Sequence, residues 1–124
     1  MTRIAVVADD LIWASRLSDA VRRAGAEPCR VRGGAAIEGI AATTSGCHGA
    51  IVDTALMTAE PMAVISALAG VGLPVLAVAN HDDVALRKRA LAAGAGKVLA
   101  YRKLHEDGQA VVSAWLRSLP AGVP

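Results

Sequence analysis

The chain has 124 residues, of which 54% are hydrophobic and 19% are charged, and its formal net charge is +2. This length is that of one domain, and a composition so rich in apolar residues excludes an intrinsically disordered chain. So small a charge does not favour binding to nucleic acid or to a membrane surface, because such binding needs several clustered cations. We expect one folded domain over residues 1–119 and a C-terminal tail at 120–124.

Short apolar runs alternate with longer segments rich in alanine and leucine, and this alternation repeats along the whole chain. Such a pattern predicts a parallel β-sheet with α-helices on both faces. The expected strands are 3–8, 27–32, 49–53, 74–79 and 97–101. The expected helices are 11–24, 35–44, 61–69, a segment from Asp82 or Asp83 to Gly94, and 109–119.

The remaining segments and the cysteines argue for a cytoplasmic protein. Cys29 and Cys47 have no CxxC spacing and no nearby pair of histidines, so neither a disulfide framework nor a zinc site is predicted. The uncharged stretch 61–81 is interrupted by two glycines and a proline, which argues against a membrane span. The first apolar run, 4–8, is too short for the core of a signal peptide.

Three aspartates follow two of the expected strands. Asp9 and Asp10 close the apolar run 4–8, and Asp53 closes the run 50–52. The carboxyl ends of parallel strands lie at one edge of a sheet, so these carboxylates should be neighbours. Like charges repel unless a cation or a proton lies among them, and the pattern therefore predicts a divalent-metal site with a phosphoryl-acceptor pocket. The alternative is that all three are helix caps and solvated loop residues.

Together these features resemble the receiver domain of bacterial response regulators. The matching pieces are Asp9-Asp10, Asp53, the strand 74–79 and the segment 92–96. The resemblance implies a flavodoxin-like α/β fold with five parallel strands in the order 2-1-3-4-5 and five helices. It also implies that Asp53 accepts a phosphoryl group while weakly bound Mg²⁺ neutralises the crowded oxygens. The metal ligands would be Asp10, Asp53, the backbone carbonyl of Ala55 and, through water, Asp9.

Other positions depart from the family pattern. Ala79 stands where the family has Ser or Thr, Tyr101 where it has Lys, and Val98 at the aromatic switch position. A hydrogen bond to a charged group contributes roughly 1.5–3 kcal/mol, so losing these donors should weaken phosphoryl transfer strongly. Two replacements are conceivable from the sequence: Lys103, if the fifth strand continues, and Asn80, if it turns inward from its loop.

We therefore expect a signalling domain without enzymatic activity, whose phosphorylation switch is degenerate and which acts through protein contacts. The alternative is a working single-domain response regulator phosphorylated on Asp53 by a histidine kinase; a small α/β enzyme has no supporting motif. The partner would be another signalling protein or a second copy of the chain. The expected partner face is basic and comprises Arg87, Lys88, Arg89, Arg102 and Lys103.

Two further residues have competing interpretations. Trp13, just after the acidic pair, could cover the pocket, but an aromatic residue early in a helix is more often a packing or partner contact. His48 beside Cys47 has no further ligands nearby, so an exposed loop is favoured over a metal site.

Overall fold

A computed structural model describes residues 2–40 and 44–120. Within these residues the chain forms one parallel sheet in the strand order β2-β1-β3-β4-β5, which confirms the predicted order. Both neighbours of β3 run parallel to it, so the end of β3 lies at the middle of the carboxyl edge of the sheet. The strands are β1 (Arg3–Val7), β2 (Glu27–Val31), β3 (Gly49–Asp53), β4 (Val75–Ala79) and β5 (Lys97–Ala100).

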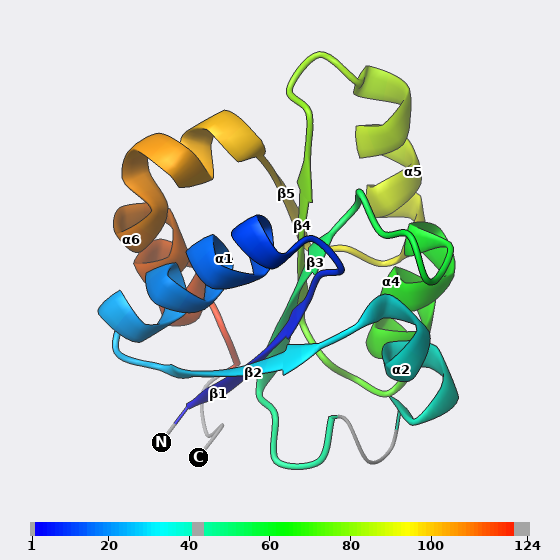
Figure 1. Cartoon of the computed structure of the whole chain (residues 1–124), viewed down its shortest axis with the longest axis horizontal. Helices are drawn as coiled ribbons and strands as arrows, with labels where there is room; N and C mark the ends of the chain where they lie inside the picture. The colour runs from blue at the N-terminus through cyan, green and yellow to red at the C-terminus, as the bar shows by residue number, and fades with distance from the viewer. Residues whose placement is uncertain (1, 41–43, 121–124) are drawn as a thin grey trace.

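Helices cover both faces of the sheet. In Figure 1, α1 and α6 lie on one face, and α2, α4 and α5 lie on the other. The first group packs on Ile51 and Val78, and the second packs on Val52 and Ala77, because successive side chains of a strand point to opposite faces. The helices are α1 (Leu11–Arg23), α2 (Gly33–Glu38), α4 (Pro61–Gly70), α5 (Val84–Ala93) and α6 (Tyr101–Arg117).

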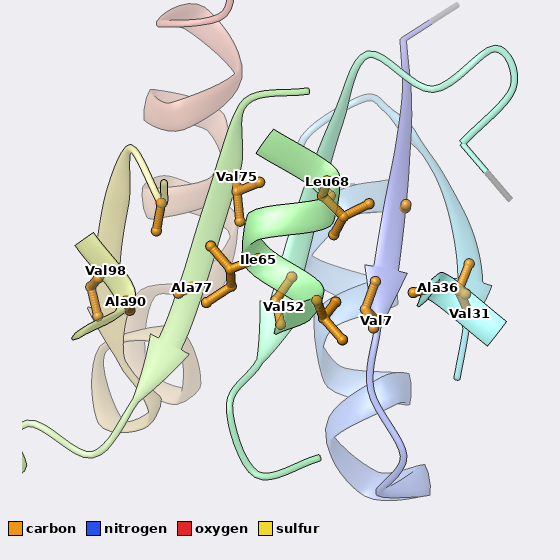
Figure 2. Packing of buried hydrophobic residues seen from close by; sticks show 14 of the residues in the cluster. Val7, Val31, Ala36, Val52, Ile65, Leu68, Val75, Ala77, Ala90 and Val98 are labelled. Carbon is orange, nitrogen blue, oxygen red and sulfur yellow. The ribbon is translucent and has the colours of Figure 1, made fainter. Parts of the chain in front are cut away.

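The core is built mainly from small and branched aliphatic side chains, because the chain contains no phenylalanine. Figure 2 shows Ile65 and Leu68 of α4 packed over Val52, with all three fully buried. On the opposite face Trp115 of α6 is only 4% exposed. A Cβ atom at Gly49 would lie 2.9 Å from the Trp115 ring, so glycine at this position makes room for the indole.

Most predicted element bounds agree with the structure within one or two residues, but one helix start, that of the last helix, was wrong. The second helix begins at Gly33 rather than at 35; part of the predicted range 35–44 lies outside the described residues, as do residues 121–124 of the predicted tail. The last helix begins at Tyr101 rather than at 109, so the fifth strand stops at Ala100.

Helix α6 is interrupted after its first turns. Asp107 has the non-helical angles φ −133° and ψ 36°, and Gly108 follows it. Both residue types are poor helix formers, which explains why the sequence suggested a later start. Leu104 is the buried side chain of the segment before this break, and Val112 and Trp115 are buried after it.

Candidate functional site

Asp53 lies at the end of β3 and is fully buried. Its Oδ1 atom accepts a hydrogen bond from the backbone N–H of Ala55 at 3.0 Å and a second, short one from the Tyr101 hydroxyl group. Its Oδ2 atom is buried and has no hydrogen-bond partner among the described residues. Buried polar atoms are almost always paired in folded proteins, so this oxygen marks a place where a donor or a cation would be stabilised.

Tyr101 covers Asp53 from the start of α6. Its ring packs against Trp13 of α1 with 4.7 Å between ring centroids and 56° between ring planes. Burial raises the pKa of the Tyr101 hydroxyl group, and the hydrogen bond to Asp53 raises it further, so the phenol stays neutral and acts as a donor. Trp13 therefore makes a packing contact, as an aromatic residue early in a helix often does, and the residue on which it packs is the one that covers Asp53.

A pocket of about 510 Å³ opens beside this contact. Besides Tyr101, four of its residues carry side-chain oxygen or nitrogen atoms: Asp10, Trp13, Asp53 and Asn80. Asn80, one of the two conceivable replacements, follows β4 and is one of the lining residues. The pocket is lined by Asp10, Trp13, Asp53, Ala55, Met57, Asn80 and Tyr101.

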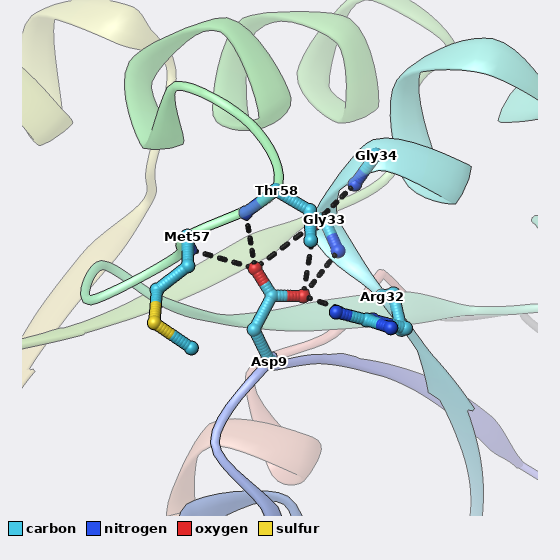
Figure 3. A network of polar contacts seen from close by, with 6 residues as sticks. All are labelled: Asp9, Arg32, Gly33, Gly34, Met57 and Thr58. Carbon is cyan, nitrogen blue, oxygen red and sulfur yellow. Dashed lines mark hydrogen bonds and ion pairs between the residues drawn. The ribbon is translucent and has the colours of Figure 1, made fainter.

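Asp9 is directed elsewhere, although it adjoins Asp10 in the sequence. Its side chain has no exposed surface, and Figure 3 shows its carboxylate between the start of α2 and the loop after β3. It accepts hydrogen bonds from the backbone N–H groups of Gly33 at 3.0 Å and of Met57 and Thr58 at 2.7 Å. The Thr58 hydroxyl group also donates to it, and Arg32 Nε lies 3.7 Å from Oδ1.

The ionisation of Asp9 follows from these contacts. Burial alone raises the pKa of its carboxyl group, but the backbone hydrogen bonds from Thr58, Gly33 and Met57 outweigh burial and lower the pKa to about 2. Asp9 is therefore a charged residue whose lone pairs are already used within the fold.

Asp10 has a third role. Its Oδ1 atom accepts hydrogen bonds from the backbone N–H groups of Ile12 at 2.8 Å and Trp13 at 3.1 Å, so Asp10 is the N-cap of α1. The helix-cap interpretation is thus correct for this aspartate, whose other oxygen remains available to the pocket.

These positions do not fit a preformed magnesium site. Over residues 2–40 and 44–120, no group of three or more His, Cys, Asp and Glu side chains is arranged to hold a metal ion. Mg²⁺ prefers several oxygen ligands in octahedral geometry. Asp9 is committed to backbone donors, and Tyr101 stands against Asp53, so the ligand set implied by the resemblance is divided in this conformation.

The positions that depart from the family pattern lie at the end of β4, in β5 and at the start of α6. Ala79 ends β4 and Val98 lies in β5, and both are buried in the apolar cluster under α4 and α5. Lys103 does not replace the missing cation. It lies in α6 rather than in a continued strand, and its Nζ atom pairs with Asp107 at 3.2 Å. Residues two apart on a helix point to nearly opposite sides, so Lys103 faces away from Tyr101.

The expected basic face is exposed but partly neutralised. Arg89 pairs with Glu60 at 3.6 Å, Arg102 with Glu106 at 2.9 Å, and Lys103 with Asp107 as above. Arg87 and Lys88 of α5 are the two remaining cations of this face. Both are exposed, and neither has an ion pair within the described part of the chain.

The prediction for His48, in the loop before β3, was wrong in one respect. His48 is half-buried rather than exposed, and its Nδ1 atom accepts a hydrogen bond from the backbone N–H of Arg3 at 2.9 Å. Within the described part of the chain, Cys29 and Cys47 are not joined by a disulfide bond.

Three residues around the carboxylates were not anticipated: Gly33, Met57 and Thr58. Gly33 and Thr58 hold Asp9, and Met57 both donates to Asp9 and lines the pocket. A Cβ atom at Gly33 would lie 3.1 Å from Leu56, which is a reason for glycine at that position. The paired glycines Gly33 and Gly34 could have indicated a close backbone approach at this position, whereas no local sequence pattern indicated that Thr58 binds Asp9.

Comparisons with known proteins support the fold. The chain matches the receiver domain of the TMAO respiratory system response regulator TorR with a TM-score of 0.80 and 18% identity, over 97% of this chain and 100% of that one. A two-component response regulator from Clostridium difficile matches with a TM-score of 0.78 and 18% identity, over 94% and 97% of the two chains. A protein provisionally assigned to pilus assembly, CpaE from Burkholderia thailandensis, matches with a TM-score of 0.77 and 20% identity, over 95% and 98%.

No family model and no curated protein matches the sequence. At these identities the likeness establishes the receiver-domain fold, and the site chemistry has to be argued from the residues. Among the helices of residues 2–40 and 44–120, none combines the length and the apolar character needed to cross a bilayer.

Proposed function

We propose that this chain is a receiver-type signalling domain that acts through protein contacts and whose phosphorylation switch is degenerate. The observation that carries this proposal is the hydrogen bond from the neutral Tyr101 hydroxyl group to the buried Asp53. In this position Tyr101 covers the carboxylate that would have to attack a phosphoryl group, and it offers no positive charge to the product.

The apolar residues nearby give independent support. A phosphoryl group on Asp53 would need donors for its oxygens, but Ala79 provides none and is 2% exposed. Val98 is buried in the edge strand β5. Its short side chain cannot exchange between exposed and buried rotamers as an aromatic switch would. We therefore expect no coupled rearrangement on addition of a phosphodonor.

The test is an intact-mass measurement after incubation with acetyl phosphate and Mg²⁺. We expect little stable adduct on the unchanged chain, and little spectral change with beryllofluoride as a phosphoryl mimic. The matched restoration, Ala79→Thr together with Tyr101→Lys, should increase adduct formation at Asp53. A substantial phosphoprotein peak in the unchanged chain that disappears in Asp53→Asn would overturn the proposal.

One observation favours the second candidate, a phosphorylatable response regulator served by a histidine kinase. Asp53, Asp10, Ala55 and Asn80 line one pocket, and Asp53 Oδ2 lacks a partner. If Tyr101 swings away, weak Mg²⁺ binding by Asp10, Asp53 and the Ala55 carbonyl group becomes available, and Asn80 could contact a phosphoryl oxygen. The mass experiment distinguishes the two candidates directly.

The proposed partner surface comprises the exposed basic residues of α5 and of the start of α6. Arg87 and Lys88 carry its unpaired charges, whereas Arg89, Arg102 and Lys103 have acidic neighbours in the chain. An acidic patch on a signalling protein, or on a second copy of the chain, would be complementary to it. Binding should be constitutive, weakened by moderate salt and unaffected by Asp53→Asn.

This surface is tested by recovering partners with the immobilised chain and repeating the experiment with Arg87→Glu and Lys88→Glu. Asp82→Asn, in the loop before α5, is a matched control on the same side of the molecule. Loss of binding in the two charge reversals alone supports the assignment. Binding that survives both reversals and disappears in Asp53→Asn would show that the functional surface is elsewhere.

A further inference from the structure

The Asp53 pocket combines features that suit an organic cation better than a metal ion. It is lined by Asp53, whose buried Oδ2 atom has no hydrogen-bond partner among the described residues, and by Asp10, whose second oxygen is not used in capping α1. Two aromatic rings, Trp13 and Tyr101, line the same space. Carboxylates beside aromatic faces are the usual environment for guanidinium and ammonium groups.

Exposed apolar side chains lie in the pocket lining and next to it in the sequence. Leu11 and Ile12 at the start of α1 are 78% and 64% exposed, and Met57 in the loop after β3 is 78% exposed. Leu11 and Ile12 directly follow Asp10, and Met57 itself lines the pocket. Met57 therefore offers an exposed apolar contact at the pocket itself, and Leu11 and Ile12 offer two more directly after Asp10.

Charge within the chain does not satisfy the pocket. Among the ion pairs of residues 2–40 and 44–120, none includes Asp10 or Asp53. The nearest arginine on the same helix, Arg16, places its guanidinium group 5.3 Å from the centroid of the Trp13 ring. Trp13 thus already accepts one guanidinium group, and the carboxylates beside it lack one.

We propose that this pocket binds an arginine side chain of a partner protein, presented between apolar residues. The guanidinium group would stack beside Trp13 and donate to Asp53 Oδ2 and Asp10, while the flanking apolar residues contact Leu11, Ile12 and Met57. Arginine suits this task because its planar group offers five donors and also stacks on aromatic rings. The proposal is separate from the basic face of α5, which would bind an acidic surface.

Tyr101 would act as the gate of this site. Asp53 is fully buried while the Tyr101 hydroxyl group stands against it, so the arginine must displace that hydroxyl group. The exchange replaces a neutral donor by a charged one and gives Oδ2 a partner. Removing the hydroxyl group should therefore strengthen arginine binding, whereas a purely structural role of Tyr101 predicts the opposite or no change.

The experiment uses the full chain labelled with ¹⁵N and two peptides, acetyl-Leu-Arg-Leu-amide and its counterpart with citrulline, which has the same shape without the charge. We expect saturable amide shifts at Asp10–Trp13, Ala55, Asn80 and Tyr101 with the arginine peptide only. Acetyl-Gly-Arg-Gly-amide should bind three- to tenfold more weakly, because it lacks the apolar flanks.

Variants complete the test. Asp53→Asn should weaken binding of the arginine peptide at least tenfold, Tyr101→Phe should strengthen it several-fold, and Asp82→Asn should leave it unchanged. If Asp53→Asn does not fold, Asp10→Asn serves instead, since asparagine still caps a helix. Equal binding of the citrulline peptide, shifts confined to other surfaces, or insensitivity to both aspartate changes would overturn the proposal. Self-association of the unchanged chain that depends on Asp53 would also overturn it, because the occupant would then be a second copy.

Discussion

Asp9 and Asp53 lie at the same edge of one sheet and differ in almost every other respect. Asp9 has three backbone donors, a hydroxyl donor and an arginine, all supplied by the chain itself. Asp53 has one backbone donor, a neutral phenol and a buried oxygen without a partner. The comparison teaches that carboxylates gathered by topology can divide into one that stabilises the fold and one that remains free to bind.

The most direct way to break this comparison is to remove the charge of Asp9. Asp9→Asn leaves several N–H groups facing an amide rather than a carboxylate, so we expect the free energy of unfolding to fall by about 3 kcal/mol. Urea denaturation followed by circular dichroism measures the change. Asp82→Asn, in an exposed loop, is the control; equal midpoints for the two variants would contradict the stabilising role of Asp9.

Acid titration sharpens the same contrast without mutation. The pKa of Asp9 is about 2 in the folded chain, against 3.8 for an unperturbed aspartate, so its contribution to stability is complete above pH 3.8. It is lost as the pH falls from 3.8 towards 2, with a total of at most about 2 kcal/mol. Denaturation midpoints recorded across this range should decline less steeply in Asp9→Asn, and parallel curves would refute the assignment.

For Asp53 the corresponding change is Tyr101→Phe. Loss of one hydroxyl donor, with the Ala55 N–H donor retained, should lower the free energy of unfolding by about 1 kcal/mol. A double-mutant cycle with Asp53→Asn isolates the contact, and the two losses should be less than additive. Strict additivity would mean that the Tyr101 hydroxyl group does not stabilise Asp53.

Magnesium should produce the smallest effect. Because Asp9 is committed elsewhere and Tyr101 covers Asp53, we expect millimolar Mg²⁺ to add less than about 0.5 kcal/mol of stability. Thermal melts with and without MgCl₂ test this, and Asp10→Asn should abolish any shift that is seen. A shift of several degrees in the unchanged chain would show that the three carboxylates form a working metal site after all.

The fold was largely predictable from the sequence. The first four strands are short runs that end at or within two residues of Gly, Asp or Asn, and this pattern placed Asp53 correctly at the end of β3. The cap of α5 was also visible, since Asp83 accepts a hydrogen bond from the Leu86 N–H at 3.0 Å. Local chemistry determines such features, so a single sequence carries them.

The division of the site could not be predicted, because it depends on contacts between residues that are far apart in the sequence. The Asp9 partners Gly33 and Thr58 are 24 and 49 residues away, at the start of α2 and in the loop after β3, and no local pattern specifies their approach to Asp9. The role of Lys103 was missed because the segment after Ala100 could extend the strand or begin a helix. That choice rotated Lys103 away from Asp53 and brought Tyr101 over it.

The interruption of α6 at Asp107 has a consequence for how the molecule opens. The segment before it is held to the core by Leu104 and by the Tyr101 contacts, whereas the longer segment after it is anchored by Val112 and Trp115. Two helical segments joined by a non-helical residue need not unfold together. The first segment can therefore exchange its amide hydrogens with solvent, and uncover Asp53, while the rest of the domain stays folded.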